Sequence, residues 1–212
     1  MRVLIGCERS GVIRRAFRER GHDAWSCDLV PADDASEYHL QCDVFDVLDR
    51  CWDLMIFHWP CTYLTRAGAG WLFNTPKKPK PDVLYGEARR KAMIESAYNF
   101  KRLLDAPIPR ICGENPIPYR DAAKIMGKYS QKIQPYEFGH PERKGTCLWL
   151  RHLPPLIPTK IVPLPEKRSE AQRLHYLSPS PERARLRSIS FKGIGEAMAD
   201  QWGGESGMIA VC

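Results

Sequence analysis

Short apolar runs alternate along this chain with segments that have the periodicity of amphipathic helices. Residues 2–6 form an aliphatic and β-branched run of strand length, which predicts a buried strand, and residues 24–28 and 53–57 predict further strands. Residues 10–21 and 86–105 instead place their apolar side chains at helical spacing. This alternation is typical of an open α/β sheet, mostly parallel, with helices on both faces.

The remaining elements complete a seven-stranded sheet. The runs before and after the sequence GHPERKG predict a terminal antiparallel hairpin. Further strands are predicted at residues 38–43, 109–113, 133–138 and 146–150, and further helices at 121–128 and 191–202.

Two segments break the alternation. Residues 71–83, with TPKKPKPD at their centre, are too rich in Pro and Lys for regular structure and predict an exposed loop, a candidate lid. Residues 153–165 contain five prolines and predict a stiff, extended connector.

The length of 212 residues suits one domain with a core that needs neither disulfides nor a structural metal. The eight cysteines form no CxxC pair, and none has a His at zinc-ligand spacing, so we expect no metal site. No apolar stretch is long enough to span a membrane, which predicts a cytoplasmic protein with mostly free thiols and no membrane partner.

A formal net charge of +7 modestly favours a polyanionic partner. The charge distribution indicates more: residues 167–192 contain seven Lys or Arg against two Glu, with His175 and Tyr176 among them. A basic stretch with an aromatic residue suits phosphate contacts and base stacking. A solvated surface segment is the alternative.

Ligands of a doubly wound sheet bind at the carboxyl ends of its strands, so the residues after each strand are the candidates. The first strand ends in GCERSG, a turn whose backbone could approach a cofactor or simply be tight. Asp28 and Asp43 end the second and third strands, where an acid can bind a ribose or an adenine amino group. Each Asp could equally be a turn residue or helix cap. Together these features sketch a site for an adenosine-containing cofactor.

The fourth strand ends in HWPC and the fifth in GENP, which would bring Cys61 and Glu114 to one cleft. A cysteine attacks as the thiolate, and positive charge from Arg143 and Lys144 could lower its pKa. Glu114 is costly to bury unless it is protonated or paired. An inert buried cysteine and a surface turn are the alternatives, but the strand-end position favours a nucleophile.

The ordered set GCERSG, Asp28, CDV, HWPC, GENP and the basic RKGTCLW resembles the cytosine-5 DNA methyltransferases, especially short phage and prophage proteins. The resemblance implies a class I S-adenosylmethionine-dependent (Rossmann-like) methyltransferase fold. It implies Cys61 as nucleophile, Glu114 as acid and base-recognition group, and Arg143 as the residue that orients the base. The residues that it assigns to S-adenosylmethionine are Gly6, Cys7, Glu8, Ser10, Gly11, Asp28, Asp43 and Pro60.

The resemblance also implies an organisation and a partner. We expect a catalytic domain at 1–150, a reduced target-recognition region at 151–190 and a returning helix at 191–212. The substrate would be duplex DNA with a flipped cytosine, bound through residues 143–144 and 167–192 in a bacterial or phage-infected cell.

Three departures from the family pattern keep other functions open: Trp59, the glycine turn and the short recognition region. The glycine turn lacks the usual aromatic residue and paired glycines. Trp59 stands where the family has a compact ring, and it could stack on a base or narrow the cleft. The short recognition region predicts slight sequence specificity, or specificity supplied by a protein partner. Modification of another pyrimidine, in a nucleotide or RNA, is therefore an alternative, as is a catalytically silent nucleic-acid-binding protein.

Overall fold

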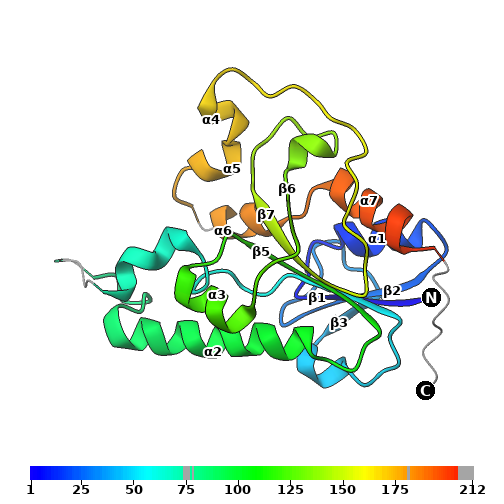
Figure 1. Cartoon of the computed structure of the whole chain (residues 1–212), viewed down its shortest axis with the longest axis horizontal. Helices are drawn as coiled ribbons and strands as arrows, with labels where there is room; N and C mark the ends of the chain where they lie inside the picture. The colour runs from blue at the N-terminus through cyan, green and yellow to red at the C-terminus, as the bar shows by residue number, and fades with distance from the viewer. Residues whose placement is uncertain (74–76, 78, 181, 205–212) are drawn as a thin grey trace.

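A seven-stranded sheet forms the centre of the protein (Figure 1). The computed structural model describes residues 1–73, 77, 79–180 and 182–204. The strands lie in the order β3-β2-β1-β4-β5-β7-β6. Their bounds are β1 Arg2–Gly6, β2 Asp23–Asp28, β3 His39–Gln41, β4 Leu54–Phe57, β5 Arg110–Pro116, β6 Gln131–Ile133 and β7 Thr146–Arg151.

The direction of the strands agrees with the predicted fold class. Strands β1 to β5 pair in parallel, whereas β7 runs antiparallel to both of its neighbours, β5 and β6. All four residues of β4 are buried, which is typical of a parallel strand covered on both faces. The predicted Rossmann-like α/β fold with an antiparallel end is therefore confirmed.

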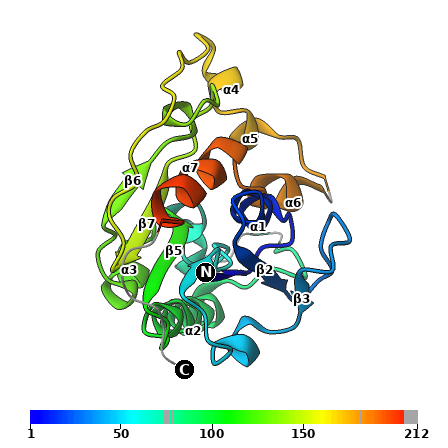
Figure 2. The same ribbon diagram turned by 90° about the vertical axis from the view of Figure 1, so that its right-hand side faces the viewer.

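Helices cover both faces of the sheet (Figure 2). Helices α1 (Val12–Arg18) and α7 (Lys192–Trp202) pack against one another and supply Phe17, Met198 and Trp202 to the core of one face. Helix α2 (Gly86–Leu104) and α3 (Arg120–Met126) cover the other face, where Phe100 packs edge-on against Phe57. In the part of the chain that the structure describes, no helix could cross a membrane.

The strand order reverses between β1 and β4. Strand β1 is followed by β2 on one side, whereas β4 is followed by β5 on the other. Open α/β sheets bind their ligands at the carboxyl ends of the strands next to such a reversal. The turn after β1 and the loop after β4 therefore lie where this fold places a ligand site.

The predicted strand at residues 133–138 is wrong. Strand β6 ends at Ile133, and a 3-10 helix, η3 (Pro135–Glu137), replaces the rest. Pro135 has no N–H to donate to a ladder, and Gln134 and Glu137 form a capping box that turns the chain.

The fifth strand, predicted at residues 109–113, is longer than expected, because β5 continues through Glu114 to Pro116. Antiparallel pairing with β7, which includes Glu114 opposite Leu148, extends the strand. Glu114 is therefore held by a sheet rather than by a surface turn.

Short helices occupy segments for which the sequence predicted none. After β7, residues 152–167 are irregular, in keeping with the predicted connector. Three short helices follow within the basic segment, and two 3-10 helices flank the loops after β3 and β4. Their bounds are α4 Arg168–Ala171, α5 Arg173–Tyr176, α6 Glu182–Ser188, η1 Val44–Val47 and η2 Arg66–Leu72.

Residues 74–76 and 78 of the candidate lid, residue 181 of the basic segment and residues 205–212 of the predicted final segment lie outside the described residues.

Gly113 provides a test of the packing beneath the candidate site. A Cβ at this position would lie 2.6 Å from Phe57 Cζ and 2.9 Å from Phe100 Cζ, and both rings are fully buried. We expect Gly113→Ala to lower the free energy of unfolding by about 1–3 kcal/mol through overpacking, measured by urea denaturation. Gly70→Ala, where a Cβ meets nothing within 4 Å, is the control. Equal stability of the two variants would contradict this account of the packing.

Candidate active site

The ends of β4 and β5 bring His58, Cys61 and Glu114 together. Phe57 pairs with Gly113, so the residues that follow each of them, His58 and Glu114, are neighbours across the two strands. The backbone N–H of His58 also donates to Gly6 O at 3.0 Å, which ties the end of β4 to the end of β1. Cys61 begins the next turn and is exposed. Cys61 and Glu114 therefore follow neighbouring strands at one edge of the sheet, and the charge of Glu114 acts on the thiol.

Glu114 is mostly buried and is paired with His58. The distance from His58 Nδ1 to Glu114 Oε2 is 2.8 Å, and the side chains are 12% and 18% exposed. Burial opposes both charges, but the hydrogen bond and the attraction between the groups outweigh it. The pKa of Glu114 is therefore lowered and the pKa of His58 is raised, as in an ion pair. Of the two ways of burying Glu114, pairing is the one that the structure shows.

A second tie between the two strand ends holds the loop that carries Cys61. Asn115 is 1% exposed, and its Nδ2 donates to Trp59 O at 2.7 Å. The indole of Trp59 donates to Ser96 Oγ of α2 at 2.9 Å and packs edge-on against Phe45. Because Trp59 is anchored to α2, its position in the loop serves packing.

The chain beyond Cys61 is held from α2. The backbone N–H groups of Leu64 and Thr65 donate to Cys61 O at 3.1 and 3.3 Å, which forms a tight turn. Arg89 is buried, and its Nη2 donates to Thr62 O at 2.9 Å. Both sides of the exposed Cys61 are therefore fixed by buried polar contacts.

The charges around Cys61 act in opposite directions. Surrounding protein atoms partly remove water from this exposed thiol, and together with the charge of Glu114 this raises the pKa of Cys61. The positive charges of Arg187 and Lys144 act to lower it. Lys144 Nζ donates to Arg187 O at 2.8 Å, so these two cations lie together beside the thiol.

Arg143 lies apart from the charges that act on Cys61 and Glu114. Its backbone N–H donates to Ala171 O at 2.6 Å, and the residue lines a hollow of about 360 Å³ with Glu166 and Arg168. Of the two basic residues predicted to act on the thiol, Lys144 is the one whose charge reaches it. The orienting role of Arg143 stays a prediction.

The glycine turn after β1 is organised by Glu8. The buried carboxylate of Glu8 accepts from the backbone of Ile13 at 2.8 Å and of Arg14 at 3.3 Å, and from Ser10 Oγ at 3.3 Å. Gly11 has a φ of 65°, which favours glycine. Glu8, Ser10 and Gly11 therefore shape the start of α1.

Gly6, the remaining glycine of this turn, is needed for packing. A Cβ on Gly6 would lie 2.9 Å from Val44 Cγ2, so this position requires glycine for close packing.

At the ends of β1, β2 and β3, the thiol of Cys7 lies within reach of the charges of Asp28 and Asp43. Burial and the charges of both carboxylates raise the pKa of Cys7 to about 12. One oxygen of each Asp makes a local contact: Asp28 accepts from Val30 N at 3.2 Å, and Asp43 caps η1. The predicted turn and cap contacts are thus present, and the second oxygen of each carboxylate makes no hydrogen bond to any other residue that the structure describes. Pro60, next to Cys61, is exposed.

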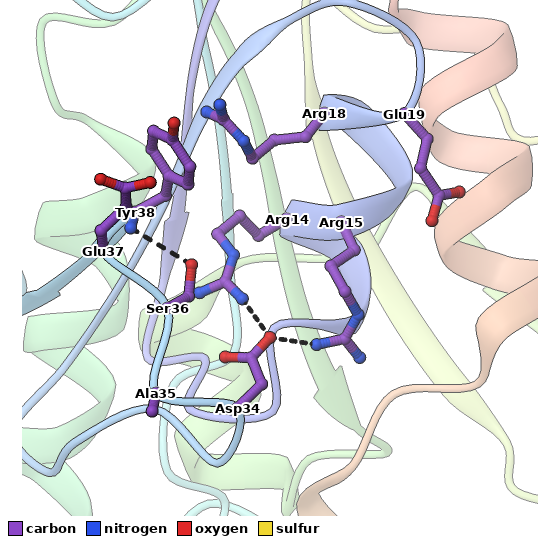
Figure 3. Close-up of a pocket in the computed structure, with 9 residues that line it drawn as sticks. All are labelled: Arg14, Arg15, Arg18, Glu19, Asp34, Ala35, Ser36, Glu37 and Tyr38. Atoms are coloured by element: carbon purple, nitrogen blue, oxygen red, sulfur yellow. Dashed lines mark hydrogen bonds and ion pairs between the residues drawn. The ribbon is translucent and has the colours of Figure 1, made fainter.

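A separate hollow of about 560 Å³ lies beside α1 (Figure 3). The carboxylate of Asp34 lies between the guanidinium groups of Arg14 and Arg15 and accepts from both. Arg18 stacks on the ring of Tyr38. The lining residues Arg14, Arg15 and Arg18 are balanced by Glu19, Asp34 and Glu37, so the hollow carries no net positive charge that would favour an anion.

Two residues near Cys61 and Glu114 were missed in the sequence. His58 directly follows a buried strand inside the HWPC sequence, and that position was the available signal. Arg187 lies in a basic segment whose approach to Cys61 no local pattern indicates. The structure contains no group of three or more His, Cys, Asp or Glu side chains that could hold a metal, as far as its described residues go.

This chain shows only limited similarity to known proteins. No protein-family model matches the chain, and a search of curated proteins finds no match. A solved structure described as a DNA modification methyltransferase encoded within a prophage of E. coli is 14% identical with a TM-score of 0.46, covering 77% of this chain and 52% of its own. A mutant of DNMT2 from Spodoptera frugiperda is 16% identical with a TM-score of 0.39, covering 78% and 55%. The chain spans about half the length of these two proteins.

The opposing charges around Cys61 predict opposite effects on its alkylation by iodoacetamide. Glu114→Gln removes a negative charge that disfavours the thiolate, so we expect Cys61 to react roughly two- to five-fold faster near neutral pH. Arg187→Gln removes a positive charge and should slow the reaction by a similar factor. Peptide mass spectrometry measures the rate at Cys61, with Lys101→Gln, a surface substitution on α2, as control. Rates that change in the same direction in both variants would contradict these charge assignments.

Proposed function

We propose that this protein transfers a methyl group from S-adenosylmethionine to carbon 5 of cytosine in DNA, through a covalent adduct on Cys61. The observation that carries the proposal is the exposed thiol of Cys61 beside the paired carboxyl group of Glu114, at the reversal point of the sheet. A nucleophile next to an acid suits a ring that must be attacked and protonated at different atoms.

Carbon 5 of cytosine is a poor nucleophile, and the two side chains overcome this together. The thiolate of Cys61 forms a bond to carbon 6 while Glu114 gives a proton to ring nitrogen 3, so carbon 5 becomes enamine-like. Carbon 5 then takes the methyl group. A water molecule then accepts the proton from carbon 5, the C–S bond breaks to return the thiolate, and ring nitrogen 3 gives its added proton to solvent, which restores the neutral aromatic ring.

Protonation of Glu114 also favours the nucleophile. In the free protein, the charge of Glu114 helps to raise the pKa of Cys61. When Glu114 is protonated against the base, this repulsion disappears while Lys144 and Arg187 continue to stabilise the thiolate. The thiol is thus held unreactive until a base occupies the site.

The polar groups around Cys7 fit a cofactor that contains adenosine but no phosphate. The N–H groups that begin α1, where a pyrophosphate would bind, already donate to Glu8. Asp28 and Asp43 offer carboxylate oxygens to a ribose and an adenine amino group. Exposed Leu29, next to Asp28, offers an apolar surface. S-adenosylmethionine meets these requirements, and when bound it supplies an electrophilic methyl group on a sulfonium.

The basic segment supports a nucleic-acid substrate. Helices α4 to α6 lie between β7 and α7, and Arg187 of α6 meets Lys144 beside Cys61. Cations at the entrance to the cleft can bind the phosphates on either side of the target base. A base within a duplex must be flipped out at a cost of a few kcal/mol, which such contacts offset.

The small size of the region between β7 and α7 favours a second candidate, carbon-5 modification of a pyrimidine in RNA or in a free nucleotide. Only residues 152–191 separate these two elements. A comparison of DNA, RNA and nucleotide substrates separates the candidates. A silent nucleic-acid-binding role has less support, because Trp59 is anchored to α2 by its hydrogen bond to Ser96.

The covalent step predicts a trapped complex. With a DNA duplex that contains 5-fluorocytosine, carbon 5 carries no proton to lose after methyl transfer, so the C–S bond to Cys61 persists. We expect a denaturation-resistant complex in electrophoresis, dependent on S-adenosylmethionine, and a modified Cys61 peptide in mass spectrometry. Cys61→Ser should form no complex and should lose more than about 100-fold in methyl transfer. Equal labelling of DNA by wild type and Cys61→Ser would show that Cys61 is not the nucleophile.

The cofactor assignment predicts a loss of affinity without a loss of folding. An Asn at position 28 or 43 still offers a carbonyl oxygen to the backbone N–H that the Asp now binds, but it carries no charge. We expect Asp28→Asn and Asp43→Asn each to weaken S-adenosylmethionine binding by about 10-fold, or about 1.4 kcal/mol, in calorimetry. Asp121→Asn, on the surface of α3, is the control. Wild-type affinity in both site variants would contradict this position for the cofactor.

A further inference from the structure

His58 approaches Glu114 from inside the protein. Its Nδ1 lies 2.8 Å from Glu114 Oε2, while its Nε2 is buried and has no hydrogen-bond partner within the described residues. The imidazole therefore has one polar connection from its ring, and this connection leads to the carboxyl group. Such an arrangement fixes the orientation of Glu114 and connects a second proton-binding group to it.

We propose that His58 is a positioning residue that acts through Glu114, holding the carboxyl group by its Nδ1–H and supplying the proton that Glu114 gives to the substrate ring. This inference rests on the proposed function and adds to it a source for the proton. Glu114 remains the catalytic residue, since it is the group that would touch the base.

One proton lies on His58 in the free protein and passes through Glu114 to the substrate ring during the reaction. In the resting pair His58 carries two ring protons and Glu114 is ionised. As the base displaces water from the cleft, the Nδ1–H bond breaks and an O–H bond forms on Glu114, which leaves both groups neutral. The O–H bond then breaks as an N–H bond forms on the ring nitrogen, in step with addition of the thiolate. After the product leaves, His58 regains a proton from solvent through Glu114.

The groups that face the pair favour this distribution of charge. Glu8, from the turn after β1, stabilises the imidazolium, while Lys144 opposes it and stabilises the Glu114 carboxylate. The hydroxyl group of Thr146 of β7 also acts to lower the pKa of Glu114. The charge of Glu114 acts on three thiols, Cys61, Cys112 and Cys147, and their pKa values are all raised, so they are uncharged near neutral pH.

The proposal predicts a specific pH dependence. Because the pKa of His58 is raised above its ordinary 6.5, the pair keeps its mobile proton up to a pH above that value. The rate constant kcat should then fall as the pH rises through the pKa of His58. In His58→Asn the amide can still donate to Glu114 but carries no mobile proton, so the alkaline limb should move toward the pKa of Glu114, which is lower.

Two measurements on the full-length protein test this proposal. The first is the pH profile of kcat for methyl transfer to DNA by wild type, His58→Asn and His152→Asn. His152 lies just beyond β7 at the opposite edge of the sheet and has a φ of 53°, which Asn tolerates, so it is a matched control. We expect the alkaline limb of His58→Asn to lie at least about one pH unit below that of wild type, with kcat at neutral pH reduced about 10-fold or more and KM little changed.

The second measurement is independent of methyl transfer. NMR titration of the His58 ring should give a pKa above 6.5 in wild type and a lower value in Glu114→Gln. An unmoved alkaline limb in an active, folded His58→Asn variant would overturn the proposal, as would identical titration of His58 in wild type and Glu114→Gln. A wild-type protein that transfers no methyl group would overturn the proposed function itself, and the proton-supply role with it.

Discussion

A carboxylate buried at the end of a central strand needs a partner, and the candidate site depends on how this protein supplies one. The hydrogen bond from His58 to Glu114 joins the ends of β4 and β5 and makes burial of both charges tolerable. The hydrogen bond from Asn115 Nδ2 to Trp59 O joins the same two segments again, one residue further along each of them. Together these contacts hold the loop in which Cys61 is exposed, so the position of the thiol follows from the way Glu114 is buried.

The two halves of the site carry opposite charge. Around Cys7, at the ends of β1 to β3, the carboxylates of Asp28 and Asp43 set a negative potential. Beside Cys61, Lys144 and Arg187 set a positive one. A cationic sulfonium cofactor and an anionic nucleic acid are the matching partners in the proposed reaction, and the reversal of strand order between β1 and β4 places the two halves side by side.

The sheet and its order of elements could be predicted because apolar periodicity is local and strong. The position of Cys61 and Glu114 at one edge of the sheet could also be predicted, because neighbouring parallel strands end at the same edge. The limits were equally physical. Residues 133–138 have strand propensity, but Pro135 and its capping box instead form a 3-10 helix. The length of β5 depended on pairing with β7, and the approach of Arg187 to Cys61 depends on a path through α4 to α6 that no local pattern specifies.

Nucleoside mass spectrometry can determine whether Cys61 and Glu114 methylate carbon 5 of cytosine. Duplex DNA is incubated with the protein and S-adenosylmethionine labelled in its methyl group, then digested to nucleosides. The account predicts labelled 5-methylcytosine with wild type and none with Cys61→Ser or Glu114→Ala. A label on another base or another atom, or unmodified DNA beside a protein that binds the cofactor, would contradict it.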